Sequence, residues 1–172
     1  VFTPSFGREM LVVLREASSG DVPYEVITME PDTSVYRMWS RVGADSAGTS
    51  AAQVEALQTR IDVALQTAPL DSAEAAQIEA AWESALLATR YPSNPEIVTD
   101  SFAAHFSMWA YGRGALSGHT QSPPEDTPAR QLVLVGLQLR GYARTGDRSF
   151  LEKALRYAEQ VQTSIGAAED GP

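Results

Sequence analysis

Apolar residues recur at alternating steps of three and four between residues 50 and 90, which is the period of an amphipathic helix. Capping boxes at Ser50–Gln53 and Asp71–Glu74 mark two starts, and Pro69 lies in a turn between them. Because the turn is short, we expect two helices packed antiparallel over 51–90. The apolar positions are Val54, Leu57, Ile61, Ala64 and Ala68 in the first helix and Ala75, Ile78, Trp82 and Ala85 in the second.

Two further starting signals follow this pair. Asn94 and Pro95 fit the cap and the first position of a helix that runs to about Gly112. Thr127 and Pro128 fit the start of another, whose segment 132–139 is apolar nearly all round and predicts the buried centre of the fold. The polar segment 117–128 between them, rich in Ser, Pro and Thr, predicts an exposed loop.

The first third of the chain is less regular. We expect a helix over 7–17, an extended connector at Tyr24–Met29, and a short helix over 34–42 followed by a flexible loop. The fold class predicted is therefore all-α. It is an antiparallel bundle of about five to seven helices over 50–166, with an irregular N-terminal arm over 1–49 and a flexible tail over 167–172.

The segment GYARTGDRSFLEKALRYAEQ, residues 141–160, contains a junction between two helices. Gly146 stands where a helix ends in the left-handed conformation, and Asp147 stands where the next helix needs a side-chain acceptor. Residues 140–151 resemble a pattern, RGYxxTGDxxFL, of helical extracytoplasmic sensor domains of bacterial kinases and chemoreceptors. The same region, with Gly146, Leu155 and Ala158, is similar to a tetratricopeptide-like (TPR-like) helical hairpin. The first resemblance implies ligand sensing and the second implies protein binding.

The amino-acid composition excludes several classes of function. A formal net charge of -9 excludes binding to the phosphates of nucleic acid as a favoured function. No apolar run approaches the roughly 18 residues of a membrane span. The absence of Cys excludes disulfides, thiolate nucleophiles and Cys-ligated metals. Location stays open, with a preference for an exported or periplasmic bacterial protein.

Few residues suggest catalysis or metal binding. His105 and Met108, three apart on the expected third helix, could ligate haem or a metal, but no HExxH motif supports them. Ser101 is four residues from His105 without the surroundings of a nucleophile, and the glycines at 112, 114 and 118 lack the Lys of a phosphate-binding loop. His119 lies in the expected loop. The sequence thus predicts no catalytic residues, no metal and no cofactor.

Aromatic residues give the best candidates for a binding surface. Trp and Tyr are enriched at interface hot spots, although core packing also explains buried rings. The candidates for partner binding are Tyr36, Trp39, Phe106, Trp109 and Tyr111. We therefore expect a non-catalytic helical domain that binds another protein, as an accessory or scaffold subunit. The alternatives are an extracytoplasmic bundle that senses a small-molecule ligand and, third, an enzyme of unknown class.

Overall fold

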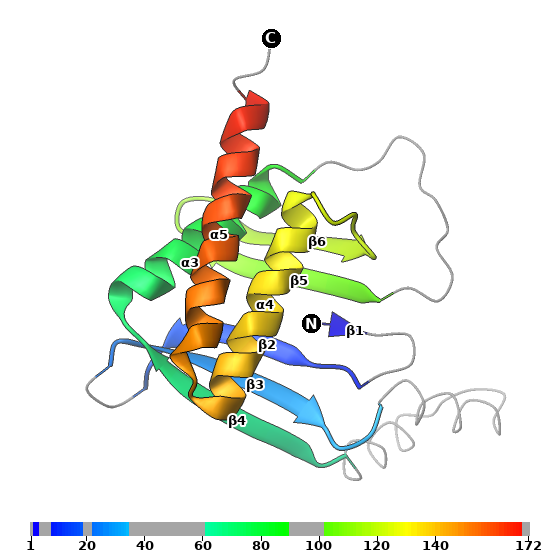
Figure 1. Ribbon diagram of the computed structural model, residues 1–172, viewed down its shortest axis with the longest axis vertical. Helices are drawn as coiled ribbons and strands as arrows, with labels where there is room; N and C mark the ends of the chain where they lie inside the picture. The colour runs from blue at the N-terminus through cyan, green and yellow to red at the C-terminus, as the bar shows by residue number, and fades with distance from the viewer. Residues whose placement is uncertain (1, 4–7, 19–21, 35–60, 90–101, 170–172) are drawn as a thin grey trace, which may run out of the picture.

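The computed structural model describes residues 2–3, 8–18, 22–34, 61–89 and 102–169. Within them, two three-stranded antiparallel sheets lie beside one another and three helices cover one side (Figure 1). The all-α prediction is therefore wrong, and so are both resemblances, because the fold is neither a TPR-like hairpin array nor a helical sensor bundle.

One sheet is a meander of three neighbouring strands, β2 (Leu11–Glu16), β3 (Tyr24–Pro31) and β4 (Val63–Leu70). In its register Val13 lies opposite Ile27, and Ile27 lies opposite Thr67. The other sheet has the order β1 (Phe2–Thr3), β5 (Ala103–Ala110) and β6 (Gly114–Gln121). Here β5 and β6 form a hairpin in which His105 lies opposite His119.

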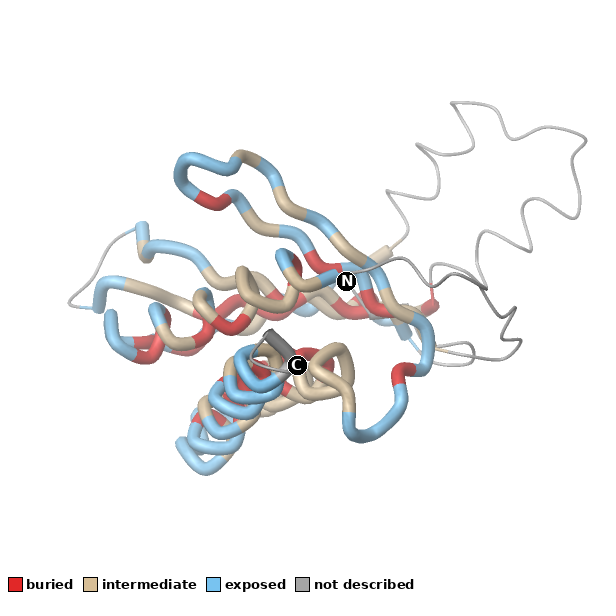
Figure 2. Tube along the Cα trace, turned by 90° about the horizontal axis from the view of Figure 1, so that it is seen from above, coloured by how far each residue is buried: buried red, intermediate tan, exposed pale blue. Residues whose placement is uncertain are grey.

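The helices form two layers over the strands. Helix α3 (Ser72–Leu87) packs against β5 and β6, and α4 (Pro128–Thr145) packs against β2, β3 and β4. Helix α5 (Arg148–Glu169) packs across α3 and α4. Buried positions gather where the helices face each other and the strands, and the outer side of α5 is exposed (Figure 2).

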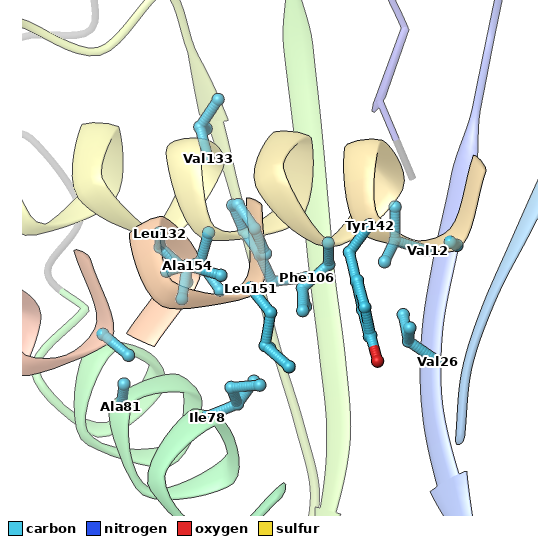
Figure 3. Close-up of a cluster of buried hydrophobic side chains, with 14 of the residues drawn as sticks. Val12, Val26, Ile78, Ala81, Phe106, Leu132, Val133, Tyr142, Leu151 and Ala154 are labelled. Atoms are coloured by element: carbon cyan, nitrogen blue, oxygen red, sulfur yellow. The ribbon is translucent and has the colours of Figure 1, made fainter. Parts of the chain in front are cut away.

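The core joins all three layers. Figure 3 shows Val12 of β2 and Phe106 of β5 on the strand side of the core, with Ile78 of α3 and Leu151 of α5 on the helix side. Polar contacts fix α4 to its sheet. The Tyr142 hydroxyl donates to the Pro69 carbonyl at 2.9 Å, and the Arg140 guanidinium donates two hydrogen bonds of 2.6 Å to Glu30 on β3.

The cap signals at residues 71, 127, 146 and 147 are confirmed, whereas Asn94 and Pro95 lie outside the described residues. Asp71 and Glu74 form the predicted capping box. The Thr127 side chain accepts from the Arg130 N–H, and Gly146 ends α4 with φ +70°. Asp147 then accepts from the Ser149 N–H at 2.9 Å, as a cap of α5 should. The segment 132–139 is largely buried, as predicted.

Three other helix predictions are wrong, because their apolar residues belong to strands. Three segments expected to be helical contain β2, β4 and β5, and the loop expected at 117–128 contains the end of β6. In β5 the even-numbered residues from Ala104 to Ala110 face the helices and the odd-numbered ones are more exposed, which is the period of a strand. The expected connector at 24–29 is a central strand with two partners. The helix over 34–42 and the capping box at 50–53 lie largely or wholly outside the described residues.

Among the described helices, none is both long enough and apolar enough to cross a bilayer.

Candidate functional site

The two sheets do not pair along most of β2 and β5, and a slot of about 840 Å³ lies between these strands. Its lining comes from four elements. These are residues 11–14 and Glu16 of β2, residues 105–109 of β5, residues 117–119 of β6, and Glu79 and Trp82 of α3. The slot therefore lies at the seam where the sheet under α3 meets the sheet under α4.

The short strand β1 occupies one end of this seam. Figure 1 shows β1 between β5 and β2. It pairs antiparallel with β5, with Phe2 opposite Ala104 and Thr3 opposite Ala103. Beyond those two pairs, residues 105–109 of β5 border the slot.

Backbone groups of β2 point into the slot at every second residue. The Ala17 N–H donates to the Pro23 carbonyl, so odd-numbered residues of β2 turn their backbone groups toward β3. The even-numbered residues Val12, Leu14 and Glu16 must then turn theirs the opposite way, toward β5. Within the described part of the chain, no backbone group pairs with them there.

The edge of β5 has the complementary arrangement. The Ser122 N–H donates to the Phe102 carbonyl, so even-numbered residues of β5 pair with β6. The backbone groups of Ser107 and Trp109 consequently point into the slot, and no described residue pairs with them. Two strand edges thus face one another across one cavity.

The inner wall of the slot is apolar and aromatic. Trp82 and Phe106 meet edge to face, with ring centroids 5.9 Å apart, and Phe106 is buried. The Trp82 indole N–H is buried and has no hydrogen-bond acceptor among the described residues. A buried donor without a partner is unusual in a folded protein.

Two glutamates stand at the other end of the slot from β1. Glu16 ends β2, and Glu79 extends from α3. Burial raises the pKa of Glu79, and the negative charge of Glu16 raises that pKa further. The two carboxylates are therefore close enough to repel each other.

On the face away from the helices, two histidines border the slot. His105 and His119 lie directly opposite in the hairpin, and their rings stack at 5.9 Å between centroids. Met108 faces the helix side of β5, so the pairing of His105 with Met108 expected on a helix cannot form on this strand. The described residues contain no group of three His, Cys, Asp or Glu side chains placed to hold a metal ion.

The predicted partner-binding residues separate in the structure. Phe106 and Trp109 both line the slot, Phe106 from the buried face and Trp109 with 77% of its surface exposed. Tyr111 is fully exposed in the turn after β5 and is not part of the slot lining. Tyr36 and Trp39 lie outside the described residues, as does Ser101.

The sequence reasoning missed the β2 edge, both glutamates and the pairing of the histidines. The run MLVVL at 10–14 and the alternation at 103–110 carried the signal for two strands, but neither could show that the strands border one cavity. Comparison of the chain with protein-family models, with curated proteins and with solved structures gave no match, so its function must be inferred from the slot.

Proposed function

We propose that this domain binds another protein by accepting an extended segment of that protein between β2 and β5. The observation that carries the proposal is the pair of strand edges that face one cavity with unpaired backbone groups. Exposed strand edges are templates for another strand, and β-strand addition is a recurrent mode of peptide recognition. A single bound strand would satisfy both edges at once.

The pleats of the two edges suit one intervening antiparallel strand. On β2 the residues that offer backbone groups, such as Val12, have side chains toward the helices. On β5 the residues whose backbone groups point into the slot, such as Ser107, have exposed side chains on the face away from the helices. A strand between them must alternate in the same way, because its successive residues bond to opposite neighbours and face opposite sides of the sheet.

The chain already places one strand at this seam. The two residues of β1 bond to β5 where the slot ends, so the spacing beside β5 there accommodates a strand (Figure 1). The slot volume of about 840 Å³ lies within the range of ligand-binding cavities. The aromatic inner wall supplies apolar contact for every second side chain of the bound segment.

Hydrogen exchange with peptide probes tests this proposal. The probes are peptides of about seven residues, a typical strand length, with alternating apolar and Thr residues. We expect slowed exchange at the Val12, Leu14, Ser107 and Trp109 amides. The same peptides N-methylated at alternate residues are the controls, since they lack the donors on one edge. Absence of binding by every alternating peptide, or protection confined to other elements, would refute the proposal.

A further inference from the structure

The two ends of the slot differ in charge. At one end it meets β1, and at the other it meets the carboxylates of Glu16 and Glu79. Among the described residues, no Lys or Arg lines it. Arg15, the cation next in sequence to Glu16, is on the other face of β2 and pairs with Glu25 at 2.8 Å. The acidic end therefore has no described cation within the slot to balance it.

The direction of a bound segment follows from the strands around it. Figure 1 shows β2 and β5 running in the same direction, and β1 runs antiparallel to β5. A segment that follows β1 in orientation is antiparallel to both neighbours, so each of its edges forms the antiparallel ladder. Its N-terminal end then lies beside Glu16 and Trp109, where β2 and β5 end, and its C-terminal end lies toward β1.

Successive side chains of the bound segment point alternately toward the helices and away from them, as in any strand. The residue opposite Phe106 faces the helices and contacts the Phe106 and Trp82 rings. Two positions earlier, the residue opposite Met108 faces the same side, nearer to Glu16 and Glu79. A basic side chain at that earlier position brings its charge to the two carboxylates while its methylene stem lies along the apolar wall.

We propose that the segment recognised by this slot carries Lys or Arg two positions before an apolar residue, and binds antiparallel to β5 with the basic side chain at Glu16 and Glu79. This inference rests on the proposed function, since it specifies the ligand of the same slot. Charge complementarity supports it, because one cation relieves the repulsion between two neighbouring carboxylates. The net charge of -9 adds a long-range attraction for basic segments.

The test compares three labelled peptides by fluorescence anisotropy. The first is Thr-Lys-Thr-Val-Thr-Val-Thr with both ends blocked. The second replaces Lys with Gln, and the third has the reversed order and the same composition. We expect the first peptide to bind about two- to fivefold more tightly than the second, as for a partly exposed ion pair. The reversed peptide should also bind more weakly, because its Lys falls at the β1 end.

Variants of the protein test whether the Lys of the peptide lies beside Glu79. Glu79→Gln should reduce the affinity for the Lys peptide by about two- to fivefold and leave the Gln peptide unchanged. Glu152→Gln on the exposed side of α5 is the matched control and should change neither. Glu79→Lys should abolish the preference for Lys over Gln in the peptide, because the new cation balances the remaining carboxylate of Glu16.

The outcomes separate this inference from the proposed function. Equal binding of the Lys, Gln and reversed peptides, with protection of both strand edges, overturns the basic motif while strand addition stands. Failure of all peptides to bind overturns both. Concentration-dependent dimerisation that protects the same edges would identify a second copy of this chain as the occupant and would also overturn the inference.

Discussion

Replacing Gly141 by Ala should reveal how closely α4 and α5 pack. A Cβ at Gly141 would lie 2.5 Å from Cδ1 and 2.9 Å from Cγ of Phe150, closer than side chains tolerate. Because Cγ is among the close atoms, rotation of the ring about its own axis cannot relieve the contact. Gly166 on α5 is the matched control, since a Cβ there would meet nothing within 4 Å.

Both substitutions gain the higher helix propensity of Ala, but only Gly141→Ala crowds the Phe150 ring. In a helix, Gly→Ala adds up to about 1 kcal/mol of stability by propensity. Crowding of the Phe150 ring should cost about 1 to 3 kcal/mol. Gly166→Ala should therefore stabilise the protein by up to about 1 kcal/mol. Gly141→Ala should be less stable than Gly166→Ala by about 1 to 3 kcal/mol, because the propensity term cancels in the comparison.

Urea unfolding monitored by circular dichroism measures both free energies, provided that the slopes against denaturant agree. Repeating Gly141→Ala in a Phe150→Ala background removes the ring, so the substitution should then stabilise as Gly166→Ala does. The reasoning is refuted if Gly141→Ala is as stable as Gly166→Ala. It is equally refuted if the loss of stability persists without the Phe150 ring.

Three further stability predictions concern the hydrogen bonds of Glu30, Tyr142 and Asp71. Glu30→Gln should cost about 1 to 2 kcal/mol by weakening the pair with Arg140. Because hydrogen bonds from Arg140 lower the pKa of Glu30, this difference should be full above about pH 4.5 and shrink below it, as urea unfolding at several pH values can show. Tyr142→Phe should cost about 1 kcal/mol through the lost bond to the Pro69 carbonyl. Asp71→Ala should lower the thermal midpoint through a loss of about 1 kcal/mol at the α3 cap, whereas an unchanged midpoint would contradict the capping role.

The parts of the fold that sequence predicted correctly are those with local causes. The capping box at Asp71 and Glu74, the Thr127 cap and the Gly146 stop each involve residues within one helical turn. Their physics is complete in a short window of sequence, and the structure contains all three. The helices α3, α4 and α5 were accordingly predicted near their true positions.

The strands were not predicted, because they depend on pairing with segments distant in sequence. The spacing of Ala64 and Ala68 fits a helix, yet both lie in β4, where Ala64 is exposed and only Ala68 and Leu70 are buried. Small residues fit either period, so pairing with β3 decides the outcome. For the same reason, only the three-dimensional register could bring His119 beside His105 or place Glu79 near Glu16.

A pair of proline substitutions tests strand addition most directly. Ser107 on β5 and Ala115 on β6 are both exposed, but the Ser107 N–H points into the slot, whereas the Ala115 N–H points to the outer edge of β6, away from the slot-lining residues. Neither N–H takes part in the pairing of β5 with β6, so both variants should fold. In a calorimetric titration with the Lys peptide, Ser107→Pro should abolish binding and Ala115→Pro should retain it. Equal binding by the two folded variants would show that the slot does not bind a strand through its backbone edges.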